Sequence, residues 1–572
     1  MRLPRPNGVA DARPRPVMRQ EHPPALLVLA ACLAPALLAL SCRSSRVPIP
    51  DEFALANRPS ASEERLVAAF HEAYAARYDA ALEEIDRLAA ENPDDPEPDL
   101  ARAHVECLRA LLSGDILADD PSVRSMTDSA EAALAKAEAR LAADPADVRA
   151  LRARGFARSY VARAHVITGS TLKAVWHAQG GAADLAASLR ATAEEERDAD
   201  PYLFLGFFHY MSGLSPSFVR AVGSVLNLTA DCDLGLREIE HAAAHGVLYR
   251  DEAKLTLAFL SLLDREADYA RSLDLLLDLT RRFPDNPGFA LVLFMAQRRV
   301  EDYAAAEATL RRILARDPAS TPEPIRLGTR VVLAGLLAEL NRFDESEAML
   351  ASLLEERSES AERVRARLHL ALGSIAERRG DRAGAEALYR EAESAIANAL
   401  RWDQESLKRE VKSRLEKPLT PDEIELRFIQ GEELRGDPAS ALALADRMAD
   451  RLAGESAPDG PAAAELRYRR GRAAAKLGRR GEAEADFRAA AGSSSATAKV
   501  RGAARFELGK LLVEAGRSKE GRDELEALTR ADAESADLRS RSLARRWLLV
   551  APASLPVPVP VLLAPGRGPD NR

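Results

Sequence analysis

Residues 370–392 read LALGSIAERRGDRAGAEALYREA, and this stretch decides the fold. Gly373 lies in an apolar run of helical spacing before Gly380, and Ala385 and Tyr389 lie one helical turn apart after it. Two antiparallel helices cross closely only where a glycine or alanine lies at the crossing, while large side chains such as Tyr389 fill the groove beside it. The stretch therefore predicts a helix, a tight turn at Gly380 and a second helix.

The same arrangement of small and large residues recurs along the chain. The second helices that begin at Tyr269 and Tyr303 are about 34 residues apart. Other units place small and large residues at matching positions: Tyr78, Ala81, Ile85, Leu88 and Pro93 in an early unit, Gly471, Gly478, Ala483, Phe487 and Ala490 in a late one, and Leu508, Gly509, Gly516, Gly521, Leu525 and Leu528 in the next. This pattern resembles the tetratricopeptide-repeat family. The resemblance implies an all-α solenoid, in which antiparallel helix pairs stack in a right-handed superhelix and no pair buries its apolar face alone.

Prolines and composition favour the same fold. Five X-Pro steps each close an apolar helical stretch, because proline forces the preceding residue out of the α region: Asn92-Pro93, Asp144-Pro145, Asp200-Pro201, Phe283-Pro284 and Asp317-Pro318. The chain has 572 residues, of which 47% are apolar but only 5% aromatic, and this suits close-packed, alanine-rich helices. We expect roughly nine or ten helix pairs between Glu63 and Val550.

The N-terminus has the features of an export signal. Arg15 and Arg19 precede an apolar run from Ala25 to Leu40, which is too short for a membrane-spanning helix. A small residue and Cys42 follow, which resembles a bacterial lipobox and implies lipidation of Cys42; an uncleaved anchor and ordinary cleavage are the alternatives. Translation can start at Met1 or at Met18.

The resemblance to bacterial lipoproteins also implies a location. Two or more acyl chains on Cys42 suffice for stable anchoring in a bilayer. Arg43, rather than aspartate, after the cysteine favours sorting to the outer membrane. We therefore expect an exported protein, held by its lipid at the periplasmic face of the outer membrane.

Changes in composition divide the chain into segments. The expected organisation is a signal peptide with lipobox at 1–42, a flexible tether at 43–62, degenerate repeat-like helices at 63–246 with an inserted helix near 212–230, central repeats at 247–402, a charged helical bridge or hinge at 403–437, C-terminal repeats with a capping helix at 438–550, and a Pro-rich disordered tail at 551–572.

The segment from Pro201 to Phe283 departs from plain repeats. An aromatic-rich helix at 202–210 runs through the turn at 212–216 into a short helix, and a Gly-Leu segment at 234–236 begins the next one. This order resembles a module in the family that contains the mammalian tetratricopeptide repeat protein thirty-nine and a yeast inclusion-body clearance protein. The resemblance implies at most lipid-related or membrane-proximal adaptor work.

Apolar and aromatic residues on first helices and on the inserted helix are the candidate lining of a groove or pocket: Leu203, Phe207, Tyr210, Phe218, Val222, Leu257, Leu291 and Met295. A groove lined in this way suits an amphipathic helix of a partner or an apolar ligand. Core packing, with the inserted helix covering the concave surface, explains the same residues. The Lys and Asn pattern with which many tetratricopeptide proteins bind a partner's carboxyl terminus is missing from these positions.

Residues with catalytic or metal-binding chemistry are sparse. His241 and His245 lie one helical turn apart, but the sequence between them lacks the glutamate of a zinc protease and offers no third ligand. Cys107 and Cys232 remain after the leader, and their pairing is open, since isolated cysteines on apolar helices are usually core residues. The chain contains no nucleophile elbow, phosphate-binding loop or dinucleotide fingerprint. We expect no enzymatic activity, metal or cofactor.

Charge excludes one class of partner. The formal net charge is −9, whereas nucleic-acid binding needs concentrated positive charge. Two functions remain. The first is a scaffold whose protein partners the sequence does not identify. The alternative is a ligand-binding lipoprotein that encloses an apolar small molecule or lipid, and it resembles the accessory component of certain tripartite transporters.

Overall fold

The structure is a computed structural model that describes residues 47–49, 60–112, 120–193, 198–214, 230–316, 321–399, 401–454 and 460–550. These residues form twenty-four α-helices and one short 3₁₀-helix, with no strand among them. The prediction of an all-α solenoid is confirmed. The signal peptide, Cys42, the helix expected near 212–230 and the Pro-rich tail lie outside the described residues.

The N-terminal lobe comprises the helices from α2 to α12. Their bounds are α2 (Ala61–Tyr74), α3 (Tyr78–Glu91), α4 (Glu97–Leu112), α5 (Pro121–Ala143), α6 (Val148–Ile167), α7 (Thr171–Ala191), α8 (Pro201–Gly213), α10 (Cys232–His245), α11 (Arg250–Ser261) and α12 (Tyr269–Arg282). Each helix packs mainly against its neighbours in the chain, as expected in a solenoid.

The central repeats follow as α13 (Pro287–Arg299), α14 (Tyr303–Leu314), α15 (Glu323–Glu339), α16 (Phe343–Leu354), α17 (Glu359–Arg378), α18 (Arg382–Ala395), η3 (Ile396–Asn398) and α19 (Arg401–Glu416). The C-terminal arm then comprises α20 (Pro421–Leu434), α21 (Pro438–Ala453), α22 (Pro461–Lys476), α23 (Arg480–Gly492), α24 (Ala498–Glu514), α25 (Ser518–Arg530) and α26 (Leu538–Val550).

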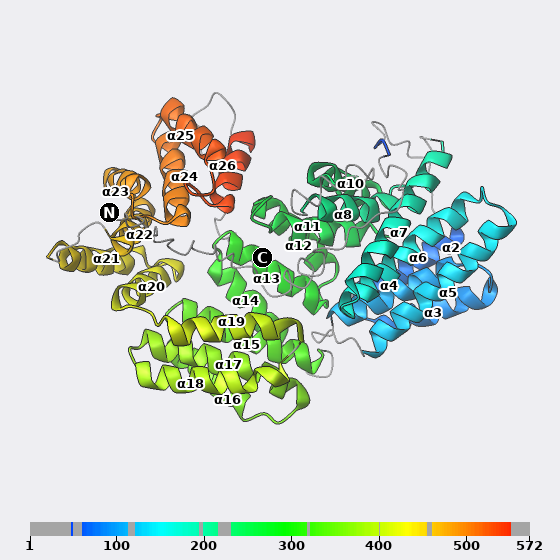
Figure 1. Cartoon of the computed structure of the whole chain (residues 1–572), viewed down its shortest axis with the longest axis horizontal. Coiled ribbons are helices and arrows are strands. Elements are labelled where there is room, and N and C mark those ends of the chain that lie inside the picture. The colour runs from blue at the N-terminus through cyan, green and yellow to red at the C-terminus, as the bar shows by residue number, and fades with distance from the viewer. Residues whose placement is uncertain are drawn as a thin grey trace, which may run out of the picture.

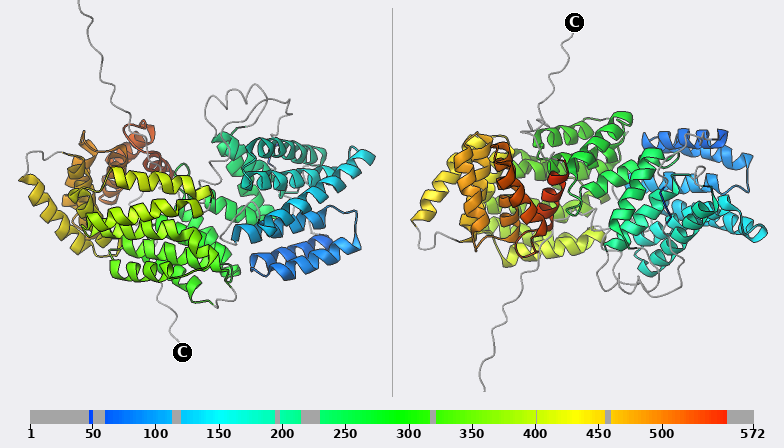
Figure 2. Two further views of the ribbon diagram at one scale, coloured as in Figure 1. Left: turned by 60° about the horizontal axis from the view of Figure 1, so that its bottom comes forward. Right: turned by 90° about the horizontal axis from the view of Figure 1, so that it is seen from above.

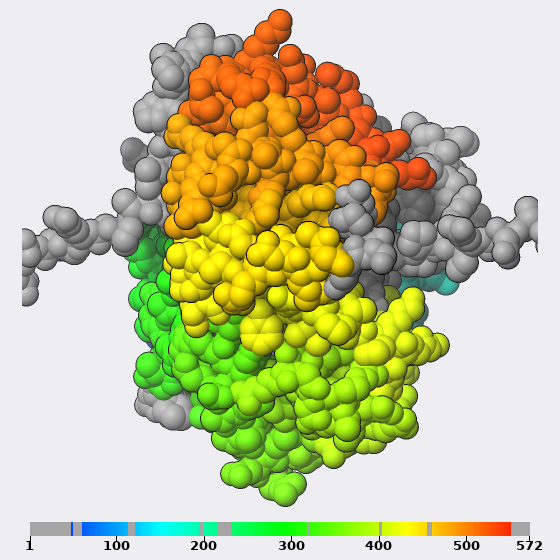
Figure 3. Space-filling view, turned by 90° about the vertical axis from the view of Figure 1, so that its left-hand side faces the viewer, coloured from blue at the N-terminus to red at the C-terminus, as the bar shows by residue number. Residues whose placement is uncertain are grey.

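The chain curls around so that its end returns to its middle. Figure 1 shows the N-terminal lobe on one side, the central repeats below, and the C-terminal arm rising until α26 lies beside α11 and α12. The view from above in Figure 2 places the same helices together. Figure 3 shows the outer face of the C-terminal arm, on which successive helix pairs are stacked in chain order.

A left-handed residue ends the first helix of several pairs. In five turns this residue is a glycine, with φ between 76° and 88°: Gly169, Gly380, Gly436, Gly478 and Gly516. Glycine suits this conformation because it has no Cβ. In three others, alanine, glutamate or asparagine adopts φ between 60° and 63°: Ala76, Glu301 and Asn341. The turn predicted at Gly380 is therefore present, and its geometry recurs where the sequence has no glycine.

The cores of the two ends differ. One continuous cluster of buried residues joins the helices of the N-terminal lobe, and it contains Phe70, Tyr74, Phe156, Phe204 and Tyr249. In the C-terminal arm the buried residues form several small clusters, mostly of alanine and leucine. None of the helices in the described part of the chain combines the length and the apolar character that a membrane span requires.

Part of the segment expected to be a flexible tether is held against the N-terminal lobe. Val47 is 3% exposed within the lobe's cluster, and the Tyr202 hydroxyl donates to the Pro48 carbonyl oxygen at 2.7 Å. Ile49 packs against the same cluster. The tether is therefore fixed at 47–49, only five residues after Cys42.

The region expected to be a bridge or hinge consists of α19 and α20, and both are tied to the central repeats. The Arg378 guanidinium stacks between the rings of Phe343 and Phe428, at 4.7 and 5.5 Å, and donates to Asn341 Oδ1 at 2.6 Å. Burial lowers the pKa of Arg378 to about 10. Because Phe428 belongs to α20, this arginine joins α20 to α15, α16 and α17. Most of residues 403–437 lie in helices α19 and α20, and their role as a bridge or hinge stays a prediction.

Candidate functional site

Three of the predicted lining residues are core residues. Leu203 and Tyr210 on α8, and Leu257 on α11, are 3%, 0% and 2% exposed. The Tyr210 hydroxyl donates to Glu266 Oε1 at 3.0 Å, which satisfies it within the protein. These side chains hold the N-terminal lobe together and do not face an open groove.

The other predicted lining residues do not join them in one site. Phe207 is partly exposed, and Leu291 and Met295 on α13 pack at the edges of two separate clusters in the central repeats. Phe218 and Val222 lie outside the described residues. A pocket beneath the predicted inserted helix therefore stays a prediction.

The module around α8 has a close helix crossing as its main feature. A Cβ on Gly206 of α8 would lie 2.6 Å from the carbonyl oxygen of Gly235 on α10. Next to this crossing, His209 Nδ1 lies 2.6 Å from Glu238 Oε2, with both side chains fully buried. Burial raises the pKa of Glu238, although His209 opposes the shift. The close crossing at Gly206 and Gly235 and the buried His209–Glu238 pair are both explained by a structural role for this module.

The histidine pair shows no metal-binding geometry. The rings of His241 and His245 lie 4.9 Å apart, and burial, followed by the charge of His245, lowers the pKa of His241 to about 4. Among the described residues, no group of three or more histidine, cysteine, aspartate or glutamate side chains could hold a metal. Cys107 and Cys232 are each buried and are not joined in a disulfide.

The densest chemistry in the described chain is a polar cluster inside the N-terminal lobe. His104 of α4 is fully buried, and its Nε2 lies 3.1 Å from the Tyr74 hydroxyl. Its Nδ1 lies 3.0 Å from the Tyr160 hydroxyl and 2.9 Å from Glu252 Oε2. Arg163 of α6 donates to Glu252 Oε1 at 3.0 Å. The cluster therefore joins helices α2, α4, α6 and α11.

Electrostatics keep this cluster charged. Burial alone would raise the pKa of Glu252, but Arg163 and then His104 outweigh it and lower the pKa to about 2. Burial raises the pKa of the Tyr74 and Tyr160 hydroxyls, so both stay protonated. Because Glu252 is 5% exposed and the histidine and both tyrosines 1% or less, the cluster cannot meet a substrate. It specifies how four helices dock.

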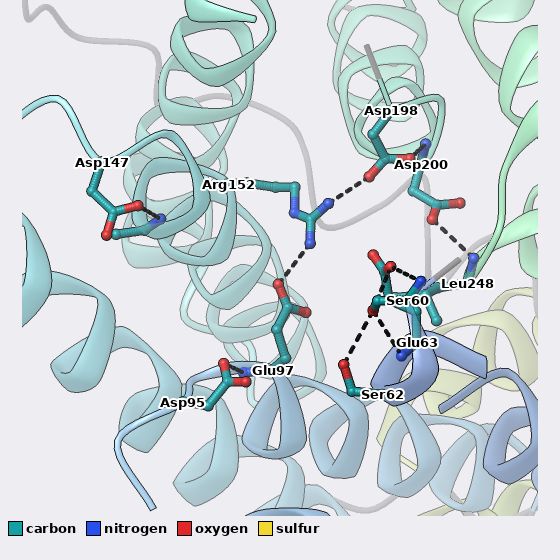
Figure 4. A network of polar contacts seen from close by, with 11 residues as sticks. Ser60, Ser62, Glu63, Asp95, Glu97, Asp147, Arg152, Asp198, Asp200 and Leu248 are labelled. Atoms are coloured by element: carbon teal, nitrogen blue, oxygen red, sulfur yellow. Dashed lines mark hydrogen bonds and ion pairs between the residues drawn. The ribbon is translucent and has the colours of Figure 1, made fainter. Parts of the chain in front are cut away.

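A second polar network lies near the start of the lobe (Figure 4). Arg152 of α6 bridges Glu97 at 2.9 Å and Asp198 at 2.8 Å. Asp200 accepts hydrogen bonds from three successive backbone N–H groups, at residues 247–249, at distances of 2.9 to 3.1 Å. The network holds residues 198–200, directly before α8, against the entry to α11.

Sequence reasoning missed both networks. The sequence signal for a buried polar residue is a polar side chain between apolar neighbours on a predicted helix. His104 lies between Ala103 and Val105, and Glu252 is followed directly by Ala253. Periodicity predicts that such a position faces the core, but it does not reveal which helix supplies the partner, because His104 and Glu252 are 148 positions apart in the numbering.

The surface most suited to a partner is the concave face of the C-terminal arm, formed by α22, α24 and α26 (Figure 1). The face has cations lying over aromatic rings. Arg472 lies 5.9 Å from the Tyr468 ring centroid, and Lys510 lies 5.3 Å from that of Phe506. The Arg472 and Lys510 side chains are 13% and 31% exposed, so both reach solvent.

Glutamates balance the cations on this face. Arg472 and Lys476 pair with Glu433 Oε1 at 2.7 and 2.9 Å, and Lys510 pairs with Glu507 at 3.1 Å. Coulombic attraction to Glu507 is the main reason that the pKa of Lys510 is raised. The face therefore offers aromatic edges and an arginine, which are enriched in protein interfaces, beside paired charges.

Comparison with known proteins supports the repeat assignment in the same arm. Residues 464–497, which contain the whole predicted late unit from Gly471 to Ala490, match the tetratricopeptide repeat family. The chain thus carries a tetratricopeptide repeat in its C-terminal arm. No curated protein matches the sequence.

Solved structures show weak similarity. The human IFIT1 dimer with m7Gppp-AAAA has 12% identity and a TM-score of 0.34, and the match covers 70% of this chain and 92% of that one. The human IFIT1 dimer with PPP-AAAA has 14% identity and a TM-score of 0.32, over 68% and 85%. The P58(IPK) TPR domain has 13% identity and a TM-score of 0.16, over 68% and 95%. Similarity at this level carries no functional argument.

Proposed function

We propose that the protein is a non-catalytic scaffold lipoprotein of the bacterial envelope, which binds a protein partner on the concave face of its C-terminal arm. The observation that carries this proposal is the row of cation–aromatic pairs at Tyr468–Arg472 and Phe506–Lys510, which are partly exposed on neighbouring first helices. Aromatic residues and arginine are the side chains most enriched in protein interfaces.

The fixed tether gives this scaffold an orientation. If Cys42 carries lipid, the five residues to Val47 span at most roughly 18 Å. Because Val47 is buried in the N-terminal lobe, that lobe lies next to the bilayer. This arrangement is consistent with anchoring at the periplasmic face of the outer membrane.

Crosslinking in native envelopes tests the proposal. The Tyr468→Ala/Phe506→Ala variant removes the aromatic rings from the concave face, while Glu484→Ala/Glu520→Ala removes exposed charges from the outer helices α23 and α25 as a matched control. We expect one protein to be captured by the parent chain and the control, and to be lost with the concave variant. Equal capture by both variants contradicts the proposal. A lipid that copurifies without any protein favours the ligand-binding alternative.

The anchor needs its own control. Replacement of Cys42 by alanine removes the acceptor of the lipid, and we expect the protein to move from the membrane fraction to the soluble fraction of the envelope. Retention in the membrane fraction would contradict lipid anchoring at Cys42 without affecting the partner-binding proposal.

A further inference from the structure

The end of the solenoid touches its middle through a small set of side chains. Arg546 of α26 forms an ion pair with Asp268, the residue that caps α12. Arg472 of α22 donates from Nη1 to Glu301 Oε1 at 3.0 Å, across the curve of the superhelix. Between these pairs, Leu543 packs against the cluster that contains Leu262 and Leu293. These contacts close the curl that Figures 1 and 2 show.

The closing contact is weaker in kind than the contacts along the chain. Helix α26 packs closely on α24 and α25, whereas it reaches α12 through three side chains: Arg546, Leu543 and Arg539, whose guanidinium lies 5.5 Å from the Tyr269 ring centroid. In each ion pair one side chain is more exposed than its partner: Arg546 is 41% exposed against 10% for Asp268, and Glu301 is 35% exposed against 13% for Arg472. Partly exposed ion pairs contribute up to about 1 kcal/mol each and are screened by salt. Small polar interfaces of this kind allow the joined parts to move.

Glu301 is an unusual residue for its position. It follows α13 with φ 63°, at the turn position that is glycine in five other units. A glutamate in this left-handed conformation costs about 1 kcal/mol relative to glycine. Burial opposes its ionisation, but Arg472 outweighs burial and lowers the pKa of Glu301 to about 2. A strained turn residue thus carries the charge that reaches the opposite side of the curl.

Opening leaves the buried Arg472 guanidinium with a partner. When Glu301 moves away, Arg472 keeps Glu433, whose Oε1 lies 2.7 Å from it within the C-terminal arm. Lys476 remains 2.9 Å from the same oxygen. Since breaking a buried pair is costly chiefly when one charge is left alone, this arrangement lets the contact separate at small cost.

We propose that the contacts of Glu301 with Arg472 and of Asp268 with Arg546 form a latch, which closes the C-terminal arm over its own concave face and must open before a partner binds there. The biological meaning of the latch rests on the proposed function, since the latch controls access to the face on which a partner is proposed to bind. The latch itself is a property of the chain alone. Opening needs only small rotations between successive helix pairs, as solenoids allow.

The test measures access to the concave face without any partner. Lys510→Cys places a thiol beside Arg472 on that face, and its reaction with a bulky maleimide, one attached to a polyethylene glycol chain, reports opening. The latch variant is Glu301→Gly/Arg546→Ala in the full chain. Glycine suits the backbone at position 301, so this variant removes the latch carboxylate without straining the fold.

Both chains carry Lys510→Cys. We expect labelling at position 510 to be about tenfold faster in the latch variant than in the parent, because the variant lacks two partly exposed ion pairs. In the parent, about 0.5 M NaCl should raise the rate in the same direction because it screens those pairs. Arg488→Cys, on the outer helix α23, is the matched control and should label at one rate throughout. Helical content and melting temperature, measured by circular dichroism, verify that the variant is folded.

An unchanged labelling rate at position 510 in a folded latch variant overturns the proposal. Acceleration at both 510 and 488 also overturns it, because general loosening would then explain the result. Neither outcome depends on a partner, so failure of the latch is distinguishable from failure of the capture experiment.

Discussion

The N-terminal lobe and the C-terminal arm are built from the same helix pairs but are stabilised differently. In the lobe, aromatic rings and buried charges join helices that are far apart in sequence, as His104 joins α2, α4, α6 and α11. In the arm, glycine and alanine at helix crossings leave small clusters between neighbouring pairs. The lobe should therefore unfold as one unit, while the arm should behave as a chain of nearest-neighbour contacts.

This difference makes the N-terminal lobe the rigid part of the chain and the C-terminal arm the adaptable part. The lobe specifies its docking geometry with hydrogen bonds that exclude solvent. In the arm, charged groups are partly exposed and lie on a face where they can exchange one ion-pair partner for another. The fixed segment at 47–49 belongs to the lobe, and the candidate partner surface belongs to the arm.

The largest effect is expected on removal of the charge at the centre of the lobe. Glu252→Ala leaves Arg163 without its buried partner and should lower the free energy of unfolding of the lobe by about 3–5 kcal/mol. The control Glu484→Ala in the arm breaks exposed pairs with Arg488 and Arg517 and should change stability by about 0.5 kcal/mol or less. Urea unfolding followed by tyrosine fluorescence and by circular dichroism measures both. Equal effects would contradict the distinction between lobe and arm.

Acidification should weaken the same contact. The pKa of Glu252 is lowered to about 2 from an ordinary value near 4.5, so the folded state binds fewer protons than the unfolded state between these values. Its contribution is therefore complete above pH 4.5 and is lost as the pH falls toward 2. The stability gap between the parent and Glu252→Gln should narrow by roughly 1 kcal/mol per pH unit below pH 4.5. A gap that does not change between pH 5 and pH 3, in urea titrations at each pH, would contradict this assignment.

Adding a methyl group at a helix crossing should have a smaller effect, and a different one in each region. Gly206→Ala would place Cβ 2.6 Å from the Gly235 backbone oxygen, so two helices must separate, at about 1–3 kcal/mol. Gly509→Ala in the arm meets the Leu525 side chain first, at 2.6 Å, and the nearest backbone atom, the Gly521 oxygen, only at 3.1 Å. We expect the fall in melting temperature of Gly509→Ala to be less than half that of Gly206→Ala. The reverse order would show that the lobe's crossing is the more adaptable one.

The sequence was sufficient for the architecture because repeats depend on local rules. Gly373 contacts the Tyr389 ring and Gly471 contacts that of Phe487, as the spacing of small and large residues predicts. The same rules place Gly380 and Gly478 in left-handed turns. Contacts within one helix pair span few residues, so they can be read from a single stretch.

The site was less predictable because it depends on contacts between distant units. Leu203 and Leu257 were apolar on predicted first helices, but periodicity does not distinguish a side chain facing the core from one facing a groove. Arg472 and Glu301 are 171 residues apart in the sequence. Their ion pair forms only because each helix pair of the solenoid is rotated by a small angle relative to the one before it. Such accumulated curvature is not encoded at any single position.

The smallest effect is expected at a turn that both regions share, and it should have opposite signs. Ala76 of the lobe has φ 62°, while Gly478 of the arm has φ 76° at the corresponding point between two helices. No heavy atom lies within 4 Å of a Cβ at 478, so Gly478→Ala changes only the backbone preference, which should cost about 1 kcal/mol. Ala76→Gly removes the same strain and should raise stability, by somewhat less because glycine also gains freedom in the unfolded chain. Melting temperatures of the two variants against the parent measure this difference. If both variants lower the melting temperature, the alanine at 76 is held by tertiary contacts of the lobe strong enough to outweigh its backbone strain, and the turns of the two regions are not equivalent after all.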